Sequence, residues 1–211
     1  MRPKFLKLKI QAEHCISGNV LDVGFAANPN SFLKDAIGLD ICLPLKKPDV
    51  YKEMIQFNLN TTDELPFADK SFKNVVVGDT IEHLENPSHF LRRANRILTD
   101  GGRLIISTPQ ANDWWVTLHN WFFRSLVNDP DPGEHLQNWT ILDMIRLLKK
   151  NGFSVKKIEG FFMYFPKIKF MIRVKKYPIL SWQVFYIAEK VGPPNSEVLT
   201  RVDDKIISVK Q

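Results

Sequence analysis

The chain has 211 residues, of which 44% are hydrophobic and 25% charged, with a net charge of +6. This composition is typical of a globular protein, and the length suits one α/β domain but leaves little room for two. No apolar run approaches the ~18 residues that a membrane-spanning helix needs, and the first residues lack the apolar core of a signal peptide. Cys15 and Cys42 form no CxxC pair, which indicates neither a disulfide framework nor a zinc site. We therefore expect a cytoplasmic protein.

The first two predicted strands, Asn19–Gly24 and Ala36–Asp40, end in residues that suit ligand binding. The first strand runs into a turn at Gly24, and the second ends on the acid Asp40. Their spacing is close to the ~20 residues expected between a phosphate-type glycine turn and a ribose-binding acid.

The connections around the second and third strands are short. Pro29 delays the helix before the second strand, and Pro44 and Pro48 interrupt the next connection. Val50–Met54 then has room for one helical turn before a third strand over Ile55–Leu59. We expect this half of the sheet to be thinly covered, with the amino-terminal segment available to cover part of it.

A strand–helix–strand crossover follows. A strand over Asn74–Gly78 leads into the polar residues Asp79–His83, and Asn86 with Pro87 marks the start of a helix. A second strand spans Arg103–Thr108. Polar residues at the strand ends lie where open α/β sheets bind ligands.

The later elements are less regular. Thr140 and Asp143 form a capping box at the start of a helix. The segments in order are an aromatic stretch over Asn112–Val127, a helix over Ile141–Lys150, strands over Phe153–Glu159 and Ser181–Glu189, and a loose polar tail over 193–211.

Several motifs in a fixed order carry a family resemblance. They are Leu65-Pro66-Phe67, Asp69, Ser71-Phe72, Val75, Glu82-His83-Leu84, Gly101-Gly102, Leu104 and Ile106-Ser107-Thr108-Pro109. With them the chain resembles the class I S-adenosylmethionine-dependent methyltransferases over roughly residues 19–160, and weakly again over 182–191. The resemblance implies a doubly wound, mostly parallel seven-stranded α/β sheet, Rossmann-like, with an antiparallel strand near one edge. It also implies a transferase that uses S-adenosylmethionine, with one domain over 1–192 and acceptor-covering segments near 110–138 and 160–180.

The resemblance also assigns cofactor-binding positions. They are Asp22, Gly24, Phe25, Ala26, Asn28, Asp40, Ile41, Asn58, Leu59, Asp79, Thr80 and His83. Asp40 would accept hydrogen bonds from the ribose hydroxyls, and Asn58 one from the adenine amino group. Ala26 and Asn28 stand where the family has glycines. Asparagine tolerates positive φ better than alanine does, so Ala26 is the less suitable residue.

Asp79, Glu82 and His83 crowd the end of the fourth strand. In one branch of the family, the quinone-biosynthesis O-methyltransferases, acids and a histidine at matching positions bind a divalent metal, and these side chains are suitable ligands. Glu-His-Leu is also common in metal-free relatives, where it orients the following loop. We favour that structural role and expect no metal.

The catalytic residues are unknown from the sequence. His119 and His135 are the candidates for a general base, because an imidazole titrates near neutral pH. The aromatic residues Trp114, Trp115, Trp121, Phe122 and Phe123 line an acceptor pocket or fill the core, and both interpretations stay open.

The segment Phe161–Tyr186 alternates aromatic residues with cations. Three interpretations are open: a cap that packs on the sheet, a clamp for an anionic substrate, or a peripheral contact with a membrane surface. We expect a small-molecule or lipid-like acceptor and no specific nucleic acid, because the cations form no groove-reading helix.

Two other functions stay open. A nicotinamide-dependent oxidoreductase can use the same kind of sheet, although no second domain is available to hold a hydride acceptor. A non-catalytic cofactor-binding or scaffold protein is the other, because Ala26 and Asn28 replace glycines.

Overall fold

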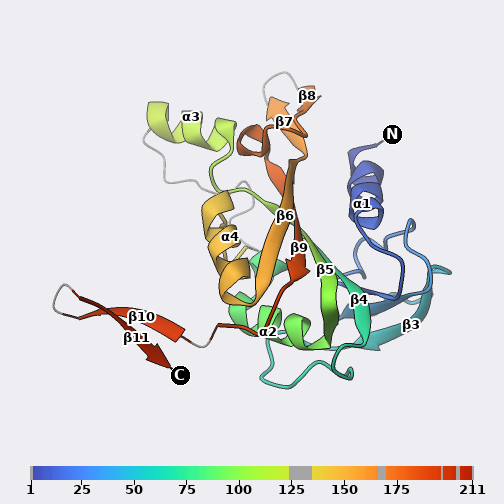
Figure 1. Ribbon diagram of the computed structural model, residues 1–211. Coiled ribbons are helices and arrows are strands. Elements are labelled where there is room, and N and C mark those ends of the chain that lie inside the picture. Colours follow the sequence, from blue (N-terminus) through green and yellow to red (C-terminus); the bar gives the residue numbers. More distant parts are fainter. Residues whose placement is uncertain (1, 124–134, 166–169, 196, 203–204, 211) are drawn as a thin grey trace.

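The computed structural model describes residues 2–123, 135–165, 170–195, 197–202 and 205–210, and the side chains at 119, 120, 123 and beyond 196 lie outside the description. One seven-stranded sheet has the order β3-β2-β1-β4-β5-β9-β6 (Figure 1). Strands β1 to β5 run parallel, and β9 runs antiparallel to both β5 and β6. The predicted fold class is confirmed. The bounds are β1 Val20–Val23, β2 Ala36–Asp40, β3 Tyr51–Gln56, β4 Phe72–Gly78, β5 Leu98–Pro109, β6 Phe153–Gly160 and β9 Gln183–Lys190.

Both faces of the sheet are covered, which is why its central strands are continuously apolar. Along β9, Tyr186 packs in the cluster that contains helices α2, Pro87–Ile97, and α4, Ile141–Lys150. The neighbouring Phe185 points to the opposite face and packs with Ile10 of helix α1, Pro3–Glu13. Figure 1 shows α4 and α1 on opposite sides of the sheet.

The predicted helix starts of α2 and α4 are confirmed. The Asn86 side chain accepts a hydrogen bond from the His89 backbone N–H at 3.0 Å. The Thr140 hydroxyl accepts one from the Asp143 backbone N–H at 3.2 Å. Each cap satisfies an amide that has no partner within its own helix.

The connections beside β2 are short, as predicted, but the short helix expected after Pro29 is wrong, because residues 24–35 and 41–50 contain turns and no helix. The predicted helical turn over Val50–Met54 is wrong, because β3 begins at Tyr51. Tyr51 pairs with Ala36 of β2 and its side chain is buried, so tertiary pairing decides the start of this strand. Asn58 and Leu59 therefore follow β3 and do not end it.

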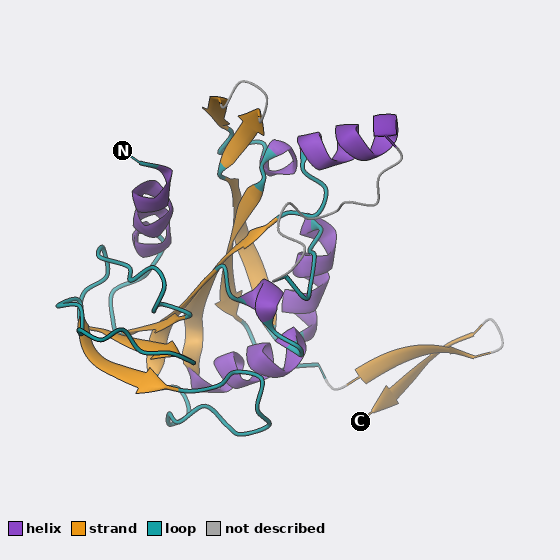
Figure 2. Cartoon of the chain, turned by 180° about the vertical axis from the view of Figure 1, so that it is seen from behind, coloured by secondary structure: helices purple, strands orange, loops and turns teal. Residues whose placement is uncertain are grey.

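The remaining elements extend beyond the main sheet. They are η1 Ile81–His83, α3 Trp114–Phe123, the hairpin of β7 Phe162–Phe165 and β8 Phe170–Arg173, and η3 Pro178–Leu180. The predicted loose tail is wrong, since β10 Glu197–Val202 and β11 Lys205–Lys210 form a hairpin that projects from the body (Figure 2). Within the described ranges, no helix combines the length and the apolar character needed to cross a membrane.

Candidate functional site

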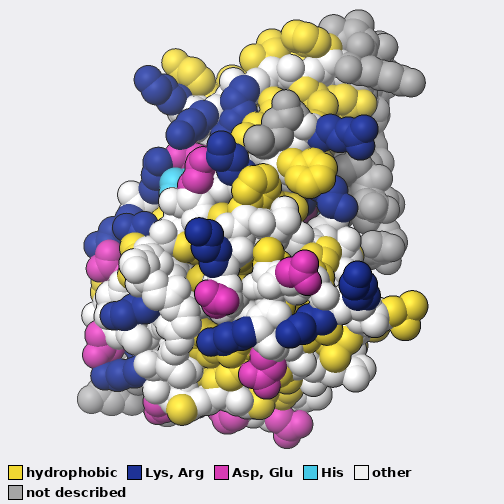
Figure 3. Space-filling view, turned by 90° about the vertical axis from the view of Figure 1, so that its right-hand side faces the viewer, with side chains coloured by type: hydrophobic (Ala, Val, Ile, Leu, Met, Phe, Trp, Pro, Cys, Tyr) yellow, Lys and Arg dark blue, Asp and Glu magenta, His cyan; other side chains and the backbone are white. Residues whose placement is uncertain are grey.

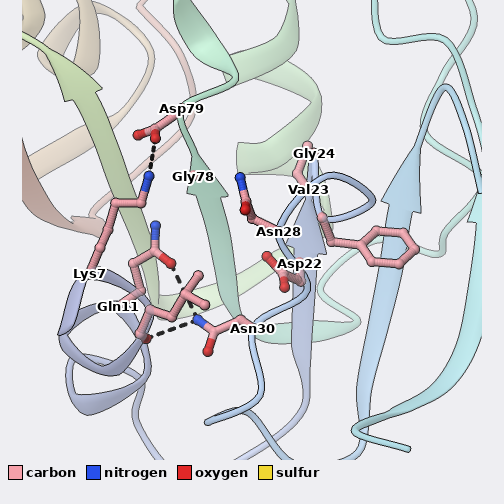
Figure 4. Close-up of a pocket in the computed structure, with 11 residues that line it drawn as sticks. Lys7, Gln11, Asp22, Val23, Gly24, Asn28, Asn30, Gly78 and Asp79 are labelled. Atoms are coloured by element: carbon pink, nitrogen blue, oxygen red, sulfur yellow. Dashed lines mark hydrogen bonds and ion pairs between the residues drawn. The ribbon is translucent and has the colours of Figure 1, made fainter. Parts of the chain in front are cut away.

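A pocket opens between β1 and β4 (Figure 4). The chain moves from β1 outward to β3 and then returns to β4, so this is the switch point where open α/β sheets bind ligands. Three parts of the chain form its walls: α1, β1 with the turn after it, and the end of β4. The lining residues are Lys7, Leu8, Gln11, Asp22, Val23, Gly24, Phe25, Asn28, Asn30, Gly78 and Asp79.

Gly24 lets the turn after β1 lie directly against the end of β4. Its φ is 72°, and a Cβ at this position would lie 1.9 Å from Oγ1 of Thr80. The Thr80 hydroxyl is itself held by the Gly78 carbonyl at 3.0 Å. A side chain at residue 24 would therefore collide with Thr80, while glycine lets the turn pack against the end of β4.

Ala26 and Asn28 do not need the freedom of glycine. Among described non-glycine residues, positive φ is confined to Asp35, Lys70 and Asp79. The Ala26 backbone N–H instead donates to a carboxylate oxygen of Asp40 at 2.8 Å. Asp40 thereby ties the turn after β1 to the end of β2, and the φ values at Ala26 and Asn28 do not require glycine.

Asp22 and Phe25 support the turn from below. Asp22 is buried, and its Oδ2 accepts a hydrogen bond from the Tyr51 hydroxyl at 2.5 Å. Burial raises the pKa of Asp22 to about 7, against the opposing effect of the hydrogen bonds from Tyr51 and the Asn30 backbone. The Phe25 ring is only 1% exposed and packs on Tyr51, with 4.6 Å between ring centroids. Both side chains shape the pocket wall.

Asp79 collects contacts from three elements. Its carboxylate pairs with Lys7 of α1 and accepts hydrogen bonds from Ser107 of β5, at 2.9 Å, and Gln183 of β9. Gln11 of α1 donates to the Ser107 hydroxyl at 2.9 Å. Figure 4 shows Lys7 reaching from α1 to Asp79 across the pocket. One edge of the pocket thus holds a cation and an anion side by side.

The contribution of α1 to the pocket was not predicted from the sequence. Lys7 and Gln11 are four residues apart, a spacing that places them on one face of a helix, and Pro3 suits a first helical turn. These signals were present. The contact of Asn30 with α1 was not predictable: its side-chain amide donates to the Leu8 carbonyl at 3.0 Å and to Gln11 at 3.3 Å.

Seven predicted positions do not line the pocket: Ala26, Asp40, Ile41, Asn58, Leu59, Thr80 and His83. Ile41 is 56% exposed, and the exposed Asn58 uses its side-chain carbonyl in a turn with the Asn60 N–H at 3.0 Å. The Leu59 carbonyl accepts a hydrogen bond from the buried guanidinium of Arg93, which also donates to the Asp63 carbonyl at 2.6 Å. Arg93 therefore orders the loop that follows β3.

Glu82, His83 and His135 form a second cluster. The imidazole centroids are 4.9 Å apart, and one ligand atom from each of the three residues lies within 4.8 Å of the others. Asp79, which the sequence grouped with Glu82 and His83, is engaged by Lys7 instead. A carboxylate with two imidazoles is a donor set that transition metals accept. The expectation that no metal binds stays a prediction.

Glu82 also has a structural role in this cluster. Its carboxylate accepts a hydrogen bond from the Thr108 hydroxyl at 3.1 Å, and its main-chain carbonyl accepts from the N–H groups of Leu136 and Gln137. Burial, together with the charge of Asp79, raises the pKa of Glu82 to about 8. These bonds place His135 beside the end of β4. His119 lies on α3, and its side chain is outside the described residues.

Comparisons with known proteins agree with this geometry. A family model described as a methyltransferase domain matches residues 15–158. An uncharacterized protein of Methanocaldococcus jannaschii is 30% identical over 105 residues, which are 47% of this chain and 50% of the relative. The chain thus spans half the length of that relative.

Two solved structures share the fold. An S-adenosylmethionine-dependent methyltransferase of Thermotoga maritima, titled a possible histamine N-methyltransferase, has a TM-score of 0.67 and 17% identity, over 88% of this chain and 89% of that one. A putative methyltransferase of Bacillus halodurans has a TM-score of 0.60 and 17% identity, over 89% and 99%. The chain therefore belongs to the methyltransferase domain family, with the class I fold and S-adenosylmethionine as its cofactor.

Proposed function

We propose that this methyltransferase acts on a small or lipid-like amphipathic acceptor that carries an anionic group. The observation that carries the proposal is the position of its aromatic and cationic segments. Both α3 and residues 161–182 follow strands, β5 and β6, whose carboxyl ends meet at the edge of the sheet where the pocket opens. Connections at this edge enclose whatever reacts with the bound cofactor.

The pocket fits S-adenosylmethionine. The amino-acid end of this cofactor is a zwitterion, and Lys7 with Asp79 offers the opposite charge to each of its two groups. Gly24 leaves room for close approach of the backbone. Asp40 accepts one backbone N–H on each carboxylate oxygen and keeps further acceptor capacity for ribose hydroxyls. We assign the adenine to the loop of Asn58 and Leu59.

Bound S-adenosylmethionine supplies a methyl group on a sulfonium that is already a good leaving group. The chain therefore has to align the acceptor atom with that methyl and to exclude water. An acceptor hydroxyl would also lose a proton. His135, fixed beside His83 at the end of β4, is the residue we assign to receive it.

The acceptor walls are joined to each other. Trp114 of α3 donates its indole N–H to the Tyr164 carbonyl of β7 at 3.1 Å, and its ring lies 4.8 Å from that of Phe165. Lys176 is exposed and is available to an anionic group. Lys175, with a side chain that is 58% exposed, already pairs with the Glu159 carboxylate at 3.3 Å. Arg173 is not available, because its guanidinium donates to the Gly160 and Phe161 carbonyls and holds the chain there.

Calorimetry and a methylation assay test the proposal together. The chain should bind S-adenosylmethionine and its demethylated product, and Asp40→Ala should weaken both by about 1–3 kcal/mol through loss of charge-assisted hydrogen bonds. Asp40→Asn keeps one carbonyl oxygen, so its cofactor affinity should lie between those of the wild type and Asp40→Ala. Label from the cofactor should appear in anionic amphipaths when extracted metabolites and lipids are offered. Label only in neutral polar metabolites, or no cofactor binding at all, would contradict the proposal.

A further inference from the structure

The hairpin of β7 and β8 exposes apolar side chains on both of its faces. Phe170, Met171 and Ile172 are consecutive in β8 and are 53%, 37% and 45% exposed. Successive residues of a strand point to opposite faces, so neither face of β8 is polar. A hairpin that only borders water presents a polar face to it. This one is built for apolar surroundings on both sides.

Neighbouring elements extend the same surface. Trp114 links α3 to β7 through a hydrogen bond, and η3 packs beside β6. Helix α3, the hairpin of β7 and β8, and η3 lie together at one end of the molecule (Figures 1 and 2). We call this surface the apolar tip. Its most exposed side chains are Trp121 at 77%, Phe122 at 67%, Phe170 at 53%, Ile172 at 45%, Tyr177 at 63% and Ile179 at 64%.

Cations, and no acids, occur in the sequence of residues 161–182, which includes the hairpin and η3 of the apolar tip. The cations are Lys167, Lys169, Arg173, Lys175 and Lys176. Lys176 is exposed, and Lys175 shares the buried carboxylate of Glu159 with Lys157, so the local charge is positive. Figure 3 shows apolar and Lys or Arg side chains together at the upper end, where the hairpin lies.

We propose that the apolar tip docks on an anionic membrane surface. Aromatic side chains enter the interface between headgroups and acyl chains, and lysines beside them are attracted to anionic headgroups. A second copy of this chain fits less well, because a symmetric contact between two tips would bring like charges together. The docked tip would turn the edge of the sheet that holds the pocket toward the membrane. The inference does not depend on the identity of the acceptor.

The full chain can be tested by flotation with vesicles of phosphatidylcholine alone and with added phosphatidylglycerol. It should float with the anionic vesicles, and Phe170→Ser with Ile172→Ser should weaken this binding at least tenfold. Leu45→Ser removes a fully exposed apolar side chain from the connection between β2 and β3 and serves as the matched control. It should bind like the wild type. Lys176→Glu should lower binding to the anionic vesicles about fivefold.

Several results would overturn the inference. One is that the wild type does not bind anionic vesicles. Another is that Leu45→Ser loses as much vesicle binding as Phe170→Ser with Ile172→Ser does. A third is a dimer, seen by light scattering, that the tip variants convert to a monomer while vesicles are not bound. Calorimetry with the demethylated cofactor shows whether each variant is folded. Because vesicle binding needs neither acceptor nor turnover, its failure is distinguishable from failure of the proposed reaction.

Discussion

The pocket and the apolar tip lie toward the same edge of the sheet, yet they are held in different ways. At the pocket, Asp79 on its wall and Asp40 beside it are each fixed by two or more hydrogen bonds. In the tip, large side chains such as Trp121 and Ile179 are mostly exposed. A fixed set of polar groups suits one constant ligand, the cofactor. Exposed apolar side chains are instead buried only when a partner covers them.

The largest effect should come from Gly24→Ala, which tests how tightly the pocket is built. The added Cβ would lie 1.9 Å from Thr80 Oγ1, so cofactor affinity should fall at least tenfold, with stability lowered by about 1–3 kcal/mol. Gly101→Ala is the matched control, because φ is 70° there and nothing lies within 4 Å. Adding Thr80→Ala should recover part of the affinity in calorimetry. If Gly24→Ala and Gly101→Ala lost the same cofactor affinity, backbone strain alone would explain the effect and the contact with Thr80 would not.

A smaller effect should follow Lys7→Met, which removes the cation of the pocket. Binding of the demethylated cofactor should weaken about tenfold, the effect of one charge-assisted hydrogen bond. Binding of methylthioadenosine, which lacks the amino-acid end, should not change. Lys9→Met, which removes an exposed lysine two residues away on α1, should leave both affinities as they are. If Lys7→Met weakens the binding of the demethylated cofactor and of methylthioadenosine equally, Lys7 acts only by holding α1 in place.

Asp22→Asn should have a modest effect that depends on pH. The folded pKa of Asp22 is about 7 and the unfolded value is 3.8, so the folded state holds a proton that the unfolded state releases in between. The contribution of Asp22 to wild-type stability should therefore fall as pH rises from about 4 to 7, and the variant should lack this part of the pH dependence. Its melting temperature should exceed that of the wild type by a few degrees at pH 8, and less at pH 5. If the melting temperatures of the variant and the wild type differed equally at pH 8 and pH 5, the raised pKa of Asp22 would be contradicted.

Removal of divalent metal should have the smallest effect. We expect a chelator to leave the melting temperature and activity unchanged, because Glu82 holds the loop of Leu136 and Gln137 through its own hydrogen bonds. A loss on chelation that magnesium or zinc restores would show that Glu82, His83 and His135 bind a metal. His135→Gln would then lose the response to added metal.

Much of the fold could be predicted from local patterns. The caps at Asn86 and Thr140 depend on residues three positions apart, and both are present as expected. The resemblance placed Gly24 and Asp79 in one pocket, because strand ends at the switch point must meet. Such features are set by neighbours in sequence or by the topology of the sheet.

The rest depends on contacts between distant residues. The start of β3 follows from the buried hydroxyl of Tyr51 on Asp22, and the approach of His135 to His83 follows from main-chain bonds to Glu82. Arg173 looked like a surface cation but binds two carbonyls of its own segment. No spacing rule indicates these partners, because each pair is joined only by folding.

The amino-terminal helix has a consequence for how this enzyme diverges from its relatives. Lys7 and Gln11 close one side of the pocket, yet α1, Pro3–Glu13, lies outside the segment that the family model matches, residues 15–158. One wall of the pocket is therefore built by residues that the family match does not include. We propose that substitutions on this face of α1 change how strongly cofactor and product are retained and leave the sheet unchanged.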